Sequence, residues 1–196
     1  MWDHLFAEPA FERHAITMRA VARSRTALDR FLAARRGSTA VEFAMVAMPF
    51  FFMMFAVLEL AFVFVLDSVL ENAVIETGRL VRTGQADNQD FNADQFKTAL
   101  CARMSIFSSD CATKVTVDVR EIPQFTNPNP PDPTGGETFS ETGLGYDHGD
   151  PGSLMLVRAW YRHTLMTPFL EQGLSRMGDG KAILTATTAF RNEPYR

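Results

Sequence analysis

The chain has 196 residues, of which 46% are hydrophobic, and its 19 basic and 23 acidic residues give a net charge of −4. A strongly basic nucleic-acid binder is excluded, because phosphate contacts require a surplus of Arg and Lys. The apolar residues are unevenly distributed, since residues 43–66 hold seven of the 17 Phe and four of the 10 Met. Residues 1–37 carry seven Arg against four acidic residues. The chain therefore divides into a basic leader, an apolar segment and an acidic remainder.

Residues 43–66 predict a transmembrane helix. The segment is 24 residues long with one charge, Glu59, and a bilayer core requires about 20 apolar residues in helical form. Its large side chains would cover every face, which argues against a helix lying on the membrane surface. A buried core helix is the alternative. A cleaved secretory signal fits poorly, because its apolar region has only about 7–15 residues.

The charges on either side of this segment predict its orientation. Seven Arg precede it, whereas Asp67, Glu71 and Glu76 follow it before the first basic residue, Arg79. The positive-inside rule then places the N-terminus in the cytoplasm and residues 67–196 outside.

Two cysteines, Cys101 and Cys111, lie in the exported part of the chain. In an oxidising compartment this pair predicts a disulfide. A zinc site would need further ligands, and the sequence has no His between residues 15 and 147. We therefore expect a Cys101–Cys111 bridge and no metal site.

The cytoplasmic edge of the apolar segment reads ARRGSTAVEF, residues 34–43. An ionised carboxylate at the start of a membrane helix is costly unless it has a partner. Cleavage after Gly37 would provide one for Glu42, namely a free α-amino group on Ser38, which is mostly cationic at neutral pH. The alternative is that Glu42 lies among the lipid headgroups, where the helix dipole favours a negative charge.

This junction is arranged as in type IV prepilins. The stretch RRGSTAVEFAMVAMPFFF resembles the N-terminal signature of TadE-like proteins, which are minor pilins or pseudopilins of the tight-adherence (Tad) pilus. LENAVIETGRLVRTGQA (70–86) and TTAFRNEPYR (187–196) are similar to the family's helix extension and closing segment. The 37-residue leader and a Pro/Gly-rich insert depart from the family pattern and leave the TadE, TadF and TadG subtypes open.

The resemblance implies processing by a prepilin peptidase between Gly37 and Ser38. It implies insertion into a bacterial inner membrane with a periplasmic C-terminal domain, and partners among the other pilin subunits and the Tad assembly machinery. Glu42 would then act as a docking charge between subunits. For Glu59 two interpretations remain: it faces Ser68 or the headgroups, or it makes a buried contact between pilin helices.

The fold class expected is α+β, with a long N-terminal transmembrane helix that extends into a small domain with an antiparallel sheet. The expected segments are a basic leader (1–37), a membrane and stalk helix (38–84) and an exported domain (85–196). The apolar residues of 67–82 recur at three- and four-residue steps, and Gly84 is a plausible C-cap.

Within the exported domain, residues 85–89 read as a polar linker and 92–104 as a short helix. Alternating patterns predict strands at 115–120, 154–165 and 181–191. Arg158, Arg162 and Asp118 fall on the polar sides of these strands. A short helix is expected from Thr167 and Pro168 to Gly178. Residues 123–152 hold six of the ten prolines and read as a loop without a core of its own.

Sequence motifs for catalysis or nucleotide binding are absent. Asp147, His148 and Asp150 could hold a cation, but they lie in the Pro/Gly-rich loop without a neighbouring nucleophile, which favours a solvated loop. We therefore expect no catalytic residue, no cofactor and no small-molecule substrate. The sequence predicts a pilin-like structural or assembly subunit. An uncleaved, membrane-anchored periplasmic binding module is the alternative, and the N-terminal residue of the mature protein distinguishes the two.

Overall fold

A computed structural model describes residues 38–126, 128–136, 138–175 and 180–195. The elements are α2 (Ser38–Arg82), α3 (Gln85–Asn88), α4 (Ala93–Arg103), the 3-10 helix η2 (Ser105–Phe107), α5 (Ser108–Lys114), β1 (Val115–Glu121), β2 (Leu154–Thr164), α6 (Pro168–Leu174) and β3 (Lys181–Arg191). The chain divides into two units between Phe52 and Met53, and the description below concerns the second. The expected α+β class is confirmed.

The sheet has three antiparallel strands in the order β1-β2-β3. Val115 of β1 pairs with Tyr161 of β2, and Leu154 of β2 pairs with Arg191 of β3. The three predicted strands are confirmed to within a residue at most ends. The two long strands have eleven residues each, because alternating apolar side chains cover one face along their whole length.

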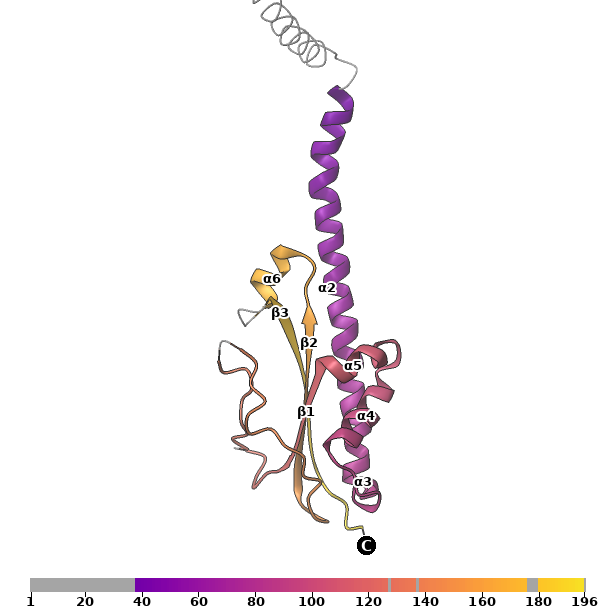
Figure 1. Cartoon of the computed structure of the whole chain (residues 1–196), viewed down its shortest axis with the longest axis vertical. Helices are drawn as coiled ribbons and strands as arrows, with labels where there is room; N and C mark the ends of the chain where they lie inside the picture. The colour runs from indigo at the N-terminus through magenta and orange to yellow at the C-terminus, as the bar shows by residue number, and fades with distance from the viewer. Residues whose placement is uncertain (1–37, 127, 137, 176–179, 196) are drawn as a thin grey trace, which may run out of the picture. The chain divides into compact units, whose positions relative to one another are not determined.

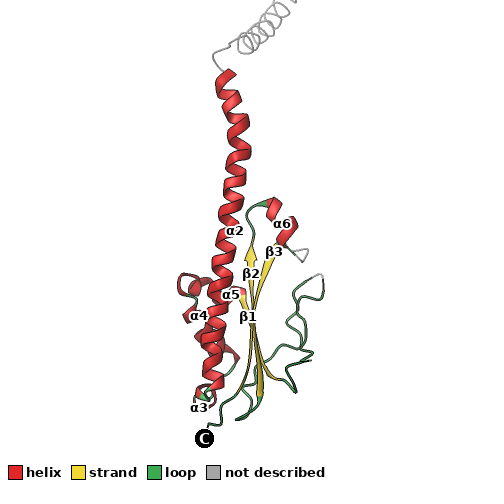
Figure 2. Cartoon of the chain, turned by 180° about the vertical axis from the view of Figure 1, so that it is seen from behind, coloured by secondary structure: helices red, strands yellow, loops and turns green. Residues whose placement is uncertain are grey.

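Helices pack on one face of this sheet (Figures 1 and 2). The buried stripe of α2 follows the predicted three- and four-residue steps and includes Leu66, Leu70, Ala73, Val74 and Val81. It joins one apolar core with residues from α4 and with the odd-numbered positions of β1 and β2, namely Phe96, Leu100, Val115, Val119, Met155, Val157, Ala159 and Tyr161. The outer part of α2 thus serves as the main covering helix of the sheet.

The described residues of the 123–152 loop cover the opposite face. Its Phe139 ring lies 6.1 Å from that of Trp160 and 5.2 Å from the guanidinium of Arg162. Tyr146 forms a β-bridge with Val119 at the free edge of β1. The loop therefore shields from water a face that the alternating pattern assigned to solvent.

Two local expectations are corrected and one is met. Residues 85–89 are not a plain linker, because Gln85–Asn88 form a helical turn that buries Ala86. The short helix after β2 ends at Leu174 rather than at Gly178, since Ser175 leaves it to form a β-bridge with Ala182. Gly178 itself lies outside the described residues. The turn after α2 matches the prediction: Gly84 is left-handed (φ 74°) and its N–H bonds the Val81 carbonyl at 3.1 Å.

Candidate functional site

The surface of α2 changes along its length. Apart from the half-buried Met54, its large apolar side chains up to residue 58 are 46–75% exposed: Val41, Phe43, Met45, Val46, Met48, Phe50, Phe51, Phe52, Met53, Phe55, Val57 and Leu58. From Val63 onwards one side of the helix is buried against the domain. Within the described residues, α2 is the one helix long and apolar enough to cross a membrane.

The predicted cleavage junction and docking charge lie at the start of this helix. Ser38 is its first residue and Glu42 follows one turn later, with an exposed side chain. Gly37, on the other side of the expected junction, lies outside the described residues. The roles expected for these three residues remain predictions.

Glu59 makes a contact that neither interpretation of the sequence anticipated. Its carboxylate accepts hydrogen bonds from two consecutive backbone N–H groups, that of Met166 at 2.5 Å and that of Thr167 at 2.9 Å. Both donors lie in the turn between β2 and α6, more than a hundred residues later in the chain. The bonds satisfy the charge within the chain, and a docking role for Glu59 between subunits remains a prediction.

The side chains around this contact are aromatic. The Phe62 ring lies 5.4 Å from the Phe107 ring and 5.5 Å from the imidazole of His163. Burial lowers the pKa of His163, and the positive charge of Lys114 lowers it further against the opposing effect of Glu59. His163 is therefore mostly neutral at pH 7, and the Glu59 carboxylate with its two backbone donors lies beside a cluster of aromatic rings.

The predicted disulfide is confirmed. Cys101 in α4 and Cys111 in α5 are bridged, with Cα atoms 5.4 Å apart. The bridge fastens the two short helices that pack beside α2 and β2 (Figure 1). Because these are the chain's two cysteines, no thiol is left for catalysis or metal binding.

Buried charges form a cluster on the face of the sheet that the 123–152 loop covers, and the sequence did not predict this cluster as a candidate site. Asp118 is 0% exposed and Arg158 is 8% exposed. The carboxylate accepts bonds from Arg158 (2.7 and 3.2 Å), from the Gly145 N–H (3.0 Å) and from Arg120. Asp118 and Arg158 lie on the polar sides of their strands, as predicted, but this side is buried because the described part of the 123–152 loop covers it. Leu156 and Trp160 are large apolar residues on the same side of β2 as Arg158, and this pattern in the sequence could have indicated that the face is covered.

Electrostatics in this cluster hold the carboxylate ionised. Burial raises the pKa of Asp118, but hydrogen bonds from Arg120, Arg158 and Gly145 outweigh it and leave the pKa below its usual value. The Arg158 guanidinium also stacks 4.8 Å from the Trp160 ring. Arg158, Arg120 and the Gly145 N–H all donate to the Asp118 carboxylate, so the arrangement stabilises the sheet. The described side chains leave no open position beside the carboxylate for a substrate.

The Tyr146–Asp150 segment is also tied to its surroundings. His148 Nε2 lies 2.9 Å from Asp87, and the Asn192 side chain donates to the carbonyls of His148 and Asp150. Burial, with a smaller effect of Asp147, raises the pKa of Tyr146 to about 12. Among the described residues, no group of three His, Cys, Asp or Glu side chains is placed to hold a metal ion.

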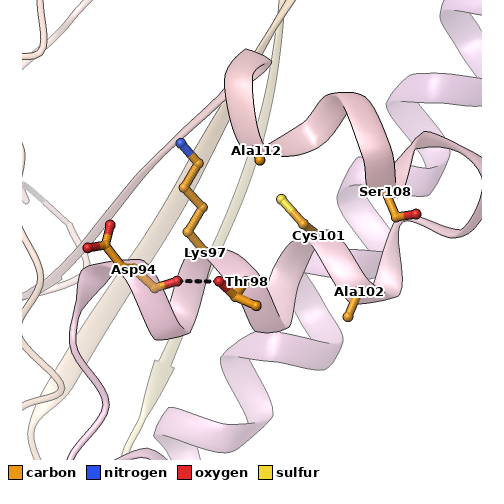
Figure 3. A pocket seen from close by; sticks show the side chains of 7 residues that line it. All are labelled: Asp94, Lys97, Thr98, Cys101, Ala102, Ser108 and Ala112. Carbon is orange, nitrogen blue, oxygen red and sulfur yellow. Dashed lines mark hydrogen bonds between the residues drawn. The ribbon is translucent and has the colours of Figure 1, made fainter.

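A shallow hollow of about 470 Å³ lies between α4 and α5 beside the disulfide (Figure 3). Its lining residues are Asp94, Lys97, Thr98, Cys101, Ala102, Ser108 and Ala112. The Thr98 hydroxyl donates to the Asp94 carbonyl at 2.8 Å, and one acid and one base are spread along the rim. These side chains do not converge on a common point, so the hollow lacks the geometry of an active site.

Comparison with known proteins identifies the N-terminal part of the chain. Residues 37–79 match the family model described as TadE-like protein, which corresponds to almost all of α2 and about a fifth of the chain. Over this stretch the chain is similar to TadE-like proteins, which confirms the resemblance predicted from its N-terminal signature. The similarity of residues 187–196 to the family's closing segment remains a prediction. No curated protein and no solved structure matches. The TadE-like family is one of pilus structure and assembly, so the match indicates a subunit associated with a Tad pilus.

Proposed function

We propose that this TadE-like chain is a pilin-like subunit of a Tad pilus, made as a precursor and cut by a prepilin peptidase between Gly37 and Ser38. The mature protein is held in the inner membrane by the N-terminal part of α2, with its α+β domain in the periplasm. Either it remains there during pilus assembly or it enters the pilus through contacts of the same helix.

The observation that carries this proposal is the exposed apolar surface of α2 between residues 39 and 58. Twelve large apolar side chains on all sides of a helix are not tolerated in water, and they fit either lipid or neighbouring apolar helices. The TadE-like match lies on this same helix. The Cys101–Cys111 bridge supports an oxidising compartment for the domain.

The N-terminal residue of the mature protein tests the processing step. In cells that contain the peptidase, mass spectrometry is expected to find a chain that begins at Ser38. Gly37→Val should accumulate the precursor, because a side chain before the scissile bond obstructs a site that accepts glycine, whereas Gly37→Ala is the milder control. An intact leader in cells that assemble the pilus would support the uncleaved, membrane-anchored binding module instead.

Glu42 supplies the test of assembly. We infer that its carboxylate pairs with the α-amino group of Ser38, in its own chain or in an adjoining subunit, because an unpaired charge in lipid costs at least about 2.5 kcal/mol. Glu42→Gln keeps the shape and removes the charge, so insertion and cleavage should persist while pilus assembly falls. Glu42→Asp, which keeps the charge, should retain part of the assembly. Normal piliation with Glu42→Gln, in a strain that needs the protein for pili, would refute this role.

A further inference from the structure

The turn and helix after β2 form an apolar projection beside α2, here called the α6 corner (residues 165–174). Met166 is 90% exposed and Phe169 is 68% exposed, although both side chains are large and apolar. Residues 164–170 carry no charge, and the exposed Glu171 is the one charged residue of the corner. Both views of the domain show α6 next to α2, at the end of the sheet away from α3 and the C-terminus (Figures 1 and 2). Such a projection on a water-soluble surface is unfavourable and indicates a contact with an apolar partner.

Hydrogen bonds fix the level of this corner along α2. Because Glu59 accepts bonds from the backbone of Met166 and Thr167, the tip of the corner lies beside Glu59. From Val63 onwards the domain buries one side of the helix, while Phe64 and Val65 on other sides remain 63% and 53% exposed. Lipid therefore has access to every side of α2 only on the N-terminal side of the corner.

The length of the exposed helix agrees with this level. Residues 39–58 form twenty helical residues, which extend about 30 Å at about 1.5 Å per residue. The hydrocarbon core of a bilayer is also about 30 Å thick. If the span ended at Leu66 instead, Glu59 and the turn that binds it would lie about 10 Å inside the hydrocarbon, where a protein loop has no water to solvate its backbone.

We propose that the α6 corner rests on the outer leaflet of the same membrane, with Met166 and Phe169 inserted at the boundary between headgroups and acyl chains. The bilayer core then ends near Glu59. This inference rests on the proposed membrane anchoring by α2 and adds a second, shallow contact that sets the tilt and height of the domain above the lipid. Uncharged residues around an exposed Met and Phe suit the interface, and the continuity of the corner with the lipid-facing side of α2 favours lipid over a protein partner.

Depth-dependent quenching tests the proposal in the full-length protein. Met166→Cys and Phe169→Cys are separate variants, each of which introduces one free cysteine at an exposed position. Because Cys101 and Cys111 form a disulfide, a fluorescent NBD maleimide labels only the introduced cysteine in each chain. Val46→Cys reports the membrane-spanning part of α2. Phe125→Cys is the matched control, because Phe125 is exposed (52%) but lies far from the α6 corner. It comes four residues after Glu121, which pairs with Met155, and Met155 is about 30 Å along β2 from Thr164, where the corner begins.

The labelled proteins are reconstituted in phosphatidylcholine–phosphatidylglycerol vesicles that carry a nitroxide either near the headgroup end or near the methyl end of the acyl chain. Labels at 166 and 169 should be quenched about twofold more by the shallow nitroxide than by the deep one. The label at 46 should be quenched strongly, and the label at 125 by neither nitroxide.

Quenching at 46 without quenching at 166 and 169 would overturn the inference and leave the membrane anchoring intact. Loss of quenching at 46 as well would overturn the anchoring itself. If the label at 166 stays open to a water-soluble quencher in vesicles and becomes shielded only when other pilus proteins are added, the corner binds a subunit and the lipid contact is wrong.

Discussion

Replacing Asp118 by Asn tests the buried charge cluster that joins the 123–152 loop to the sheet. The substitution keeps the volume of the side chain but leaves Arg158, 8% exposed, without its counter-charge. Loss of one partner of a buried ion pair costs about 3–5 kcal/mol, against a total stability of about 5–15 kcal/mol. At about 2–4 °C per kcal/mol for a chain of this size, Tm should fall by about 6–20 °C.

Tryptophan fluorescence provides the assay. The chain has two tryptophans, Trp2 and Trp160, so a Trp2→Phe background in detergent leaves Trp160 as the reporter, 4.8 Å from the Arg158 guanidinium. Asp110→Asn is the control, because it removes an exposed ion pair with Lys114 and should change Tm little. A Tm loss for Asp118→Asn no larger than that of the control would refute the reasoning.

Acid should remove the same stabilisation. The pKa of Asp118 lies below its usual value in the folded protein, so the unfolded chain binds more protons in the acidic range. The contribution of Asp118 is then complete above the unfolded pKa of about 3.9 and is lost as the pH falls through the lower folded-state pKa. Asp118→Asn should lack this step, and a denaturation midpoint with the same acid dependence in both proteins would contradict the assignment.

Three further predictions concern other parts of the domain. Replacing Cys101 and Cys111 by Ser should destabilise the domain by about 3 kcal/mol, measured as a lower midpoint in thermal unfolding, and an unchanged midpoint would refute a stabilising bridge. Gly84→Ala should cost about 1–2 kcal/mol, because the left-handed backbone disfavours a Cβ that would also meet the Tyr195 ring; equal stability would contradict this. Glu59→Ala should speed hydrogen exchange of the Met166 and Thr167 amides, with Glu59→Gln intermediate, and unchanged exchange would exclude the contact.

Local sequence patterns predicted most of the fold because they are set by short-range geometry. Apolar residues recur at three- and four-residue steps in the helix from Leu70 to Val81 and at every second position in the strand 181–191. Each element must keep its repeat in order to bury a single face. The capping box at Asn92 and Gln95 explains why α4 begins where the apolar spacing placed it. These features depend on neighbours within four residues, so the sequence alone contains them.

The charge cluster and the Glu59 contact depend on partners far away in the chain. Asp118 is forty residues from Arg158, and Glu59 is 107 residues from Met166. An alternating pattern tells which residues share a side of a strand, but it does not tell whether a distant loop covers that side. The loop at 123–152 has no periodicity from which its path could be predicted, so the burial of Asp118 became visible only in three dimensions.

The two kinds of surface on α2 account for the position of Glu59. On its N-terminal side the helix exposes apolar side chains in all directions, and on its C-terminal side one stripe is buried under the sheet from Val63. A carboxylate at this transition cannot be left in lipid without a large cost, and it would interrupt the core if it lay deeper in the domain. Two backbone N–H groups at the edge of the domain satisfy it there. The same bonds hold the β2–α6 turn beside the helix, so the site that satisfies the carboxylate also marks where the exposed apolar part of α2 gives way to the folded domain.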